Sequence, residues 1–367
     1  MNYDINGNLL NELYNINGDS LNNPSYSNEY ERNIYNAKNE WIEYTKSNSN
    51  VIPIIVHTDQ HGRLTTNNTL FSYLSNIVPF NSISACIGLG DVGNYSESVF
   101  MDMNTCLNDI PKNKQINIWG NHDTWFSSYS DNVLGEEQLN ILNTYFDNSK
   151  YNGNIKYNRY GIEYMIDEER KIKYVIIGGW EYDMNIGGYS HYIIGNDSMN
   201  YIIDMLSSTD EYDIIILSHI QPFGYNKENT KWTIPYVDDC GGGGLTGSNG
   251  NVDAVVNVND ISLDQMLIAR KNKTSGTIKD SYKNEHNYDF SNCTSDLICC
   301  LAGHEHCNWY MHQNNNIPVL IYDAYAYDTH PFYFTAIDKS NKIIKVWRVD
   351  DTPQIIRYDV PFEKVTT

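Results

Sequence analysis

The chain has 367 residues, of which 41% are hydrophobic and 19% charged, and its formal net charge is −21. This composition excludes a disordered chain, and the length predicts one large domain with an additional segment. The acidic excess produces a repulsive potential that disfavours a groove for bulk nucleic acid, because such grooves bind by neutralising phosphates.

The sequence has no segment typical of membrane insertion or secretion. Its longest apolar runs, such as 51–56 and 214–217, are far shorter than the roughly 20 residues of a membrane-spanning helix. The first residues lack the basic and apolar regions of a signal peptide. The seven cysteines lie in apolar runs, which favours reduced thiols. We therefore expect a soluble, leaderless protein, cytoplasmic or virus-encoded, with no membrane partner.

Residues 1–50 form a predicted N-terminal extension. They contain a tandem repeat, 3–11 and 14–22, and each copy carries an Asn-Gly pair that is typical of tight turns. The repeat is interpreted either as small turns in a polar leader or as an attachment element for a larger assembly. Apolar residues recur at helical spacing from Tyr30 to Tyr44, so we expect a helix that packs on the main domain.

Residues 51–350 form the predicted main domain, in which short apolar strands alternate with helical patterns. The predicted strands are 52–56, 83–89, 115–119, 173–177, 213–218 and 297–302, and the helical patterns are 70–78, 96–107, 136–146 and 198–206. This alternation predicts an α/β domain with layered sheets and helices. The chain then becomes mostly β, with predicted strands at 318–322, 332–337 and 343–349, and residues 351–367 are expected to be a C-terminal tail.

The segment 220–296 is predicted to be an insertion in this domain. Its glycine-rich run at 240–250 has no Gly-Lys-Ser/Thr ending and follows no buried strand, so a nucleotide-binding P-loop is disfavoured. A lid or specificity loop and a solvent-facing decoration remain equal alternatives. If the segment is a lid, the candidate substrate contacts are Tyr225, Trp232 and Tyr236.

Five short polar blocks follow predicted strands at their carboxyl ends, where open α/β sheets place their binding sites. Taken alone the blocks differ in weight, because Asp-x-His, Gly-Asp or a single histidine is common, whereas Gly-Asn-His-Asp and Gly-His-x-His are scarce by chance. Five blocks in order, each after an apolar strand, are a strong indication of a site. The blocks are Asp59-Gln60-His61, Gly90-Asp91, Gly120-Asn121-His122-Asp123, Ser218-His219 and Gly303-His304-Glu305-His306.

The blocks supply oxygen and nitrogen donors without a thiolate, a set that suits divalent manganese, iron or zinc. Two such ions can lie about 3.5–4 Å apart when a carboxylate bridges them, share one hydroxide and hold two oxygens of a phosphoryl group. If the backbone is extended, the alternation in Asp59-x-His61 and in His304-x-His306 directs both side chains of each pair to one side. The donor set therefore predicts a dinuclear metal centre.

The five blocks resemble those of the calcineurin-like metallophosphoesterase superfamily, across residues 59–306. The resemblance implies a four-layer α/β/β/α sandwich with a dinuclear centre at the sheet edge. It implies that one ion is held by Asp59, His61 and His306. It further implies that the second ion is held by Asn121, His219 and His304, and that Asp91 bridges both.

The resemblance also implies a mechanism, in which a bridging hydroxide attacks phosphorus in line. His122 stabilises the developing charge and protonates the departing oxygen, a general-acid contribution of roughly 10² to 10⁴-fold. Many members carry an aspartate that pairs with this histidine, but this chain has Asn94 there. An amide stabilises an imidazolium less than a carboxylate does, and Asp123 is the candidate substitute partner.

The sequence therefore predicts a metallophosphoesterase, a phosphoric ester hydrolase acting on phosphodiesters or small phosphomonoesters. The arginine-containing extension found in protein serine/threonine phosphatases is absent here, which disfavours phosphoprotein substrates. The alternative is a degenerate metal-binding protein with a structural or interaction role, and Asn94 and the N-terminal repeat favour it.

Overall fold

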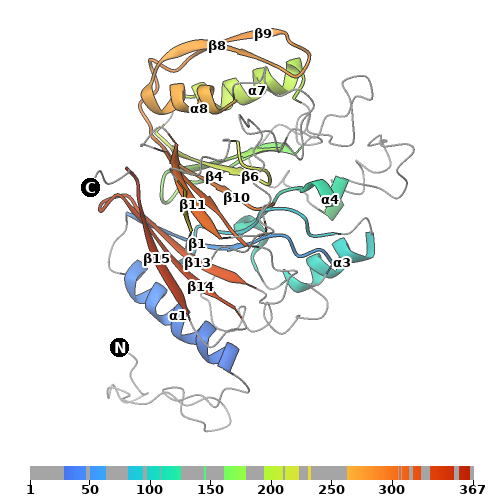
Figure 1. Ribbon diagram of the computed structural model, residues 1–367, viewed down its shortest axis with the longest axis vertical. Helices are drawn as coiled ribbons and strands as arrows, with labels where there is room; N and C mark the ends of the chain where they lie inside the picture. The colour runs from blue at the N-terminus through green and yellow to red at the C-terminus, as the bar shows by residue number, and fades with distance from the viewer. Residues whose placement is uncertain are drawn as a thin grey trace.

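The computed structural model describes eleven stretches of the chain. They are 29–46, 50–62, 82–93, 97–124, 144–145, 161–178, 194–222, 230–232, 263–323, 331–350 and 355–363, apart from 109, 210, 305, 307 and 314–316. The N-terminal repeat, the helical pattern at 70–78 and most of that at 136–146 lie outside these residues. The described elements form two facing sheets with helices on their outer sides (Figure 1).

The first sheet has six strands and a mixed topology. In spatial order they are β15 (Ile356–Pro361), β14 (Ile343–Val349), β13 (Phe332–Asp338), β1 (Val51–His57), β2 (Ala85–Gly88) and β3 (Gln115–Asn117). Because β1, β2 and β3 are parallel, their carboxyl ends lie at one edge of the sheet. The predicted C-terminal tail contributes β15, which pairs with β14 along its length and satisfies the backbone groups of that strand.

The second sheet has seven strands. In spatial order they are β4 (Ile162–Asp167), β5 (Ile172–Ile177), β6 (Asp213–Ser218), β10 (Leu297–Ala302), β12 (Ile317–Ile321), β11 (Trp309–Gln313) and β7 (Thr230–Trp232). The strands from β5 to β12 in this order run parallel, so this sheet also gathers carboxyl ends at one edge. All nine strands predicted from the sequence are present in the two sheets.

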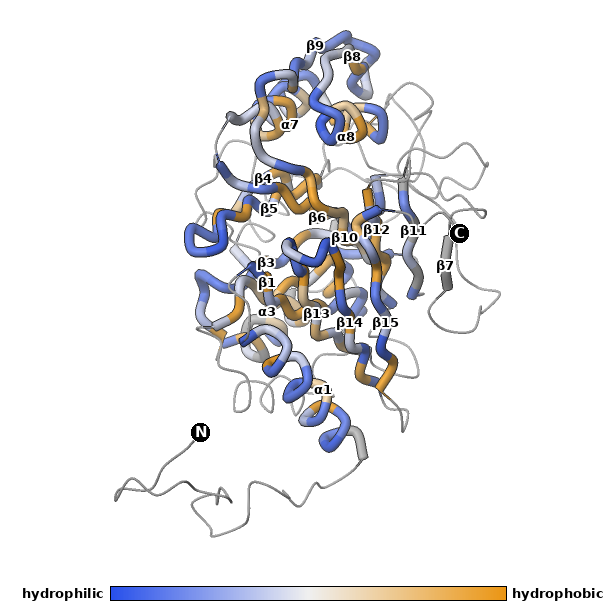
Figure 2. Tube along the Cα trace, turned by 90° about the vertical axis from the view of Figure 1, so that its left-hand side faces the viewer, coloured by the Kyte–Doolittle hydropathy of each residue, from blue (hydrophilic) through white to orange (hydrophobic). Residues whose placement is uncertain are grey.

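Apolar side chains fill the space between the sheets and also cover their outer faces. Along β1, Ile54 and Val56 belong to the cluster between the sheets, whereas Val51 and Ile55 belong to the outer cluster. Both faces of such a strand are buried, which explains its continuous apolar run. Figure 2 shows the same distribution as hydrophobic colour along the central strands.

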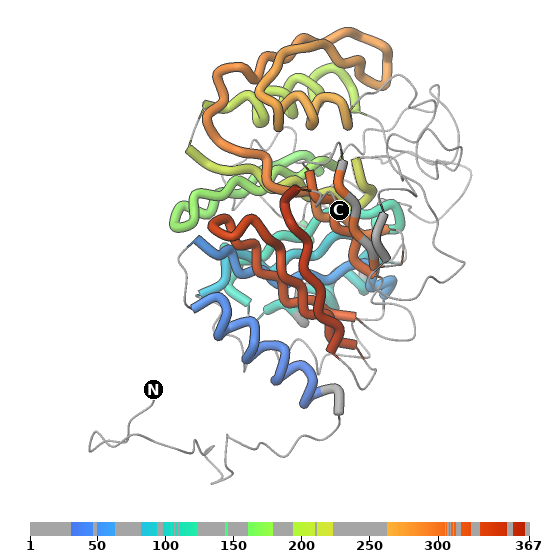
Figure 3. Tube along the Cα trace, turned by 60° about the vertical axis from the view of Figure 1, so that its left-hand side comes forward, coloured from blue at the N-terminus to red at the C-terminus, as the bar shows by residue number. Residues whose placement is uncertain are grey.

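Helices form the two outer layers, which completes the predicted α/β/β/α sandwich. Helix α1 (Glu29–Lys46) lies along the first sheet, as Figure 3 shows, and buries Trp41, whose Nε1 donates a 2.9 Å hydrogen bond to the carbonyl of Thr335. Helix α3 (Glu97–Cys106) adds Phe100 to the same apolar cluster. Helices α7 (Asn196–Ser207) and α8 (Leu263–Asn272) cover the second sheet.

Part of the predicted insertion belongs to this outer layer. Helix α8 buries Met266 and Leu267 in the core, and the hairpin of β8 (Ser275–Lys279) and β9 (Glu285–Asp289) follows it and packs against α7. Residues 263–296 therefore form part of the outer layer of the sandwich, because apolar side chains of α8 and of the hairpin are buried in the core. None of the helices in the described stretches is both long and apolar enough for a membrane span.

Candidate metal centre

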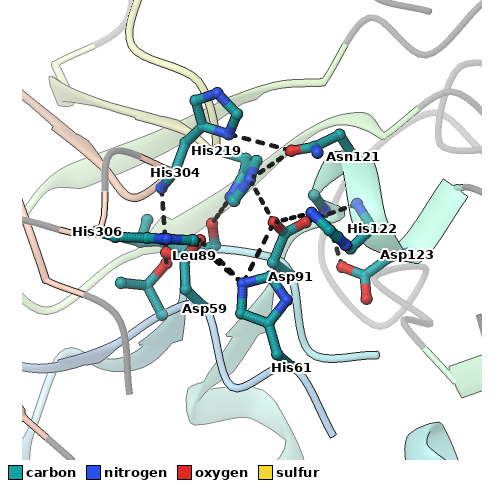
Figure 4. A network of polar contacts seen from close by, with 12 residues as sticks. Asp59, His61, Leu89, Asp91, Asn121, His122, Asp123, His219, His304 and His306 are labelled. Carbon is teal, nitrogen blue, oxygen red and sulfur yellow. Dashed lines mark hydrogen bonds and ion pairs between the residues drawn. The ribbon is translucent and has the colours of Figure 1, made fainter. Parts of the chain in front are cut away.

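The seven predicted ligands converge at the carboxyl edge of the two sheets (Figure 4). They come from the loops after β1, β2, β6 and β10 and from the short helix α4 (Asn121–Thr124), which follows β3. Donor atoms of six of them form two groups that share Asp91, each with its atoms within 4.8 Å of one another. The first group is Asp59, His61, Asp91 and His306, and the second is Asp91, His219 and His304.

In the first group, side chains from three loops point at one another. His306 Nε2 lies 3.3 Å from Asp59 Oδ1 and 3.2 Å from His61 Nε2. His61 Nε2 lies 3.9 Å from Asp91 Oδ2. Nitrogen and carboxylate donors this close together can hold one metal ion.

In the second group, His219 is the central side chain. Its Nδ1 donates to the carbonyl of Leu89 at 2.7 Å, so its Nε2 is directed at Asp91 Oδ2, 3.2 Å away. Asn121 Oδ1 lies 3.0 Å from His219 Nε2 and 3.1 Å from His304 Nδ1. The carbonyl bond fixes the tautomer that presents Nε2, as second partners of metal-binding histidines commonly do.

The carboxylates fit this interpretation because each keeps one oxygen for the centre. Asp59 Oδ1 and Asp91 Oδ2 are buried and face ring nitrogens, with His306 Nε2 3.3 Å from the first oxygen and His219 Nε2 3.2 Å from the second. A buried anionic oxygen in this state is costly unless a positive charge faces it. Burial alone would raise the pKa of Asp91, but His219 holds that pKa below its ordinary value, and His306 does the same for Asp59. Both groups are therefore ionised, and the donor set fits two divalent cations.

Protonation of the histidines responds to the same carboxylates. Burial alone would lower the pKa of His219, but Asp91 raises it to about 9. Burial lowers the pKa of His304 to about 4, with a further contribution from His219. Because a proton on His219 occupies the position of a ligand bond, cation binding at this group is coupled to proton release.

The loops that carry these side chains are not extended, contrary to the expectation from their alternation. Nine non-glycine residues in the described stretches have a positive φ, and five of them are predicted ligands. These five are Asp59, His61, Asp91, His304 and His306, with φ between 44° and 69°. The pairs therefore converge through left-handed backbone, a strained conformation that persists where the surrounding structure enforces it.

Two glycines of the blocks are required by close approach to the carboxylates. A Cβ at Gly120 would lie 2.0 Å from Asp91 Oδ1, and one at Gly303 would lie 2.6 Å from Asp59 Oδ2. Both distances are far inside van der Waals contact, so only glycine lets these loops reach the carboxylates.

His122 stands at the accessible rim of the centre. Its side chain is 28% exposed, and its Nε2 lies 4.0 Å from Asp91 Oδ2. Its ring packs edge-on against that of His61 at 4.6 Å. Burial lowers the pKa of His122, which favours the neutral imidazole.

Asp123, the candidate partner of His122, binds backbone groups with its side chain. Its two oxygens accept the backbone N–H groups of Gly93 at 2.7 Å and Gly120 at 2.8 Å. Burial raises its pKa to about 7. Asp91 Oδ2 lies 4.0 Å from the imidazole of His122, and Asp123 joins the loops after β2 and β3 through their backbone N–H groups.

The remaining predicted residues stay predictions. Asn94, Tyr225 and Tyr236 lie outside the described residues, and Trp232 is described only as backbone in β7, where it pairs with Trp309. Sequence reasoning overlooked Thr58, a buried neighbour of the centre that donates to Asp59. Its place immediately before the first block was the signal that could have found it.

Comparison with known proteins identifies similar structures but no matching sequence family. The sequence matches no family model and no curated protein. A dimetal phosphatase from Danio rerio has a similar structure, with a TM-score of 0.52 and 8% identity over 85% of this chain and 99% of that chain. Phosphopantetheinyl hydrolase from Mycobacterium tuberculosis gives a TM-score of 0.36 and 12% identity over 74% and 89%, too low to add to the argument. The similarity to the first protein shows the fold.

Proposed function

We propose that this chain, which has the fold of the calcineurin-like metallophosphoesterases, is a metal-dependent phosphoester hydrolase that binds two divalent cations. The observation that carries the proposal is the pair of ligand groups that share Asp91, together with the buried oxygens of Asp59 and Asp91 that face the ring nitrogens of these groups. Divalent ions at such a centre polarise a phosphoryl group and lower the pKa of water.

The charge of the ligand set favours an anionic substrate. Among the predicted ligands only Asp59 and Asp91 are carboxylates, so two divalent cations would leave a net positive centre. This local charge attracts a phosphate even though the protein as a whole is acidic. The net charge of −21 repels a polyanion, which favours a small phosphodiester or phosphomonoester over bulk nucleic acid.

His122 is the side chain that we assign to the substrate. It lies at the exposed side of the centre, and its lowered pKa favours a neutral ring that can donate one N–H hydrogen bond. In this state the imidazole holds a phosphoryl or leaving-group oxygen in place. The proximity of Asp91 Oδ2 at 4.0 Å favours positive charge on the ring as the reaction proceeds.

The test combines metal analysis with activity on two model substrates. Purified protein supplied with manganese should hydrolyse bis-p-nitrophenyl phosphate or p-nitrophenyl phosphate. The variant His122→Ala should lose roughly 10² to 10⁴-fold in kcat while it retains its bound metal. Binding of metal without turnover of either ester, or full activity of His122→Ala, would contradict the proposal, and the first result would favour a metal-binding scaffold.

A further inference from the structure

Two donors hold the Oδ2 oxygen of the Asp59 carboxylate. Thr58 Oγ1 donates to Asp59 Oδ2 at 2.5 Å, and the backbone N–H of His304 donates to the same oxygen at 3.0 Å. The other oxygen, Oδ1, is directed at His306 Nε2, 3.3 Å away. The two donors occupy Oδ2 and leave Oδ1 facing the first ligand group.

Asp91 also has one oxygen held by a donor, which in this case is a backbone N–H. Its Oδ1 accepts the N–H of His122 at 2.8 Å, while Oδ2 lies 3.2 Å from His219 Nε2. Each carboxylate thus has one oxygen bound by the protein and one oxygen presented to the centre. The two carboxylates differ in that a side chain, Thr58, supplies one of the donors to Asp59. This donor can be removed by a substitution, whereas a backbone N–H cannot.

Thr58 is tightly packed at this position. The residue is fully buried, and a Cβ at Gly303 would lie 2.1 Å from its hydroxyl oxygen, so the loop after β10 closes directly over it. The φ of Asp59 is 52°, in the left-handed region that non-glycine residues adopt infrequently, so the loop that carries the carboxylate has a defined backbone conformation.

We propose that Thr58 is a positioning residue whose hydroxyl orients Asp59 and thereby sets the affinity of the first ligand group for its cation. The inference rests on the proposed function only in that it requires the centre to bind divalent cations. Side chains that orient metal ligands by hydrogen bonds typically contribute 10- to 100-fold in metal affinity. Asp59 belongs to the first group alone, so the effect is expected at one of two ions.

The experiment is a calorimetric titration of metal-free protein with manganese. Thr58→Val keeps the shape and removes the donor, and it should weaken one of two binding events about 10- to 100-fold. Thr58→Ser keeps the donor and should stay within about threefold of wild type, an estimate that follows from retention of the hydrogen bond. Thr335→Val, which removes another fully buried hydroxyl on β13, is the matched control and should leave both events unchanged.

The possible outcomes distinguish failure of the Thr58 proposal from failure of the hydrolase proposal. Wild-type affinities in Thr58→Val, or equal losses in Thr58→Val and Thr58→Ser, would overturn the role of the hydroxyl while leaving the hydrolase proposal intact. Equal weakening of both ions by Thr58→Val and by Thr335→Val would show general destabilisation and also overturn it. Failure of wild type to bind two ions would overturn both proposals. If Thr58→Val does not fold, Thr58→Ala measured against Thr58→Ser gives the same test.

Discussion

The substitution Gly120→Ala tests how closely the backbone must approach Asp91. The added Cβ would lie 2.0 Å from Asp91 Oδ1 and 2.3 Å from Asp91 N, whereas ordinary contact begins at 3.4 Å. The two loops must therefore separate by about 1.4 Å. Because Asp91 Oδ1 also accepts the N–H of His122, the shift displaces either the shared ligand or the start of α4.

The expected losses follow from the tolerance of such sites. Functional groups must be held within about 0.5 Å, and a misplacement of 1 Å can cost about 100-fold in rate. We expect Gly120→Ala to lose at least about 100-fold in kcat/KM on bis-p-nitrophenyl phosphate and to retain fewer than two manganese ions. Overpacking should also reduce the free energy of unfolding by about 1–3 kcal/mol.

Elemental analysis, steady-state kinetics and urea denaturation measure these three effects. The matched control is Gly276→Ala in β8, where the new Cβ would meet the hydroxyl of Tyr288 at 2.5 Å. The hairpin of β8 and β9 contributes none of the predicted ligands, so an equally tight contact there should leave metal content and activity at the wild-type level. Two bound ions and full activity in Gly120→Ala would refute the reasoning about close approach.

Asp123→Asn places an amide nitrogen opposite a backbone N–H group, where the carboxylate oxygen now accepts a hydrogen bond. The variant should lose about 1–3 kcal/mol in the free energy of unfolding and bind manganese more weakly. An unchanged urea midpoint would contradict this. Trp41→Ala should cost about 3–5 kcal/mol in the same assay with unchanged metal content, since α1 packs on the outer face of the first sheet, and a loss of metal would show that α1 supports the centre. Tyr44→Phe removes a 2.6 Å hydrogen bond to the carboxylate of Asp338. Burial alone would raise the pKa of this carboxyl, but its hydrogen bonds hold the pKa below its ordinary value of 3.8. The stabilisation is therefore present above that pH and lost below it, so the stability difference from wild type should shrink as pH falls from about 7 to about 3, and a constant difference would contradict this.

The sequence was sufficient for the central strands and for the side chains that gather at the edge of the sheets. Strands such as β6 and β10 are buried on both faces, and their continuous apolar runs are visible without a structure. Because the ligands follow these strands directly, their carboxyl ends bring Asp91 and His219 to one edge.

Other features had no comparable signal. In β9 the buried positions are His286 and Tyr288, alternating with exposed polar residues, so the strand shows no aliphatic pattern. In β15 only Val360 is fully buried, which explains why its segment resembled a tail. The left-handed conformation of Asp59 and His61 depends on hydrogen bonds to the loop after β2, which are tertiary contacts.

The most direct test of the central claim is anomalous diffraction from crystals of the manganese-loaded protein. The proposed centre predicts two manganese peaks about 3.5–4 Å apart, with Asp91 between them as the shared ligand. A single peak, or two peaks that do not share Asp91, would contradict a dinuclear centre at this edge of the sheets.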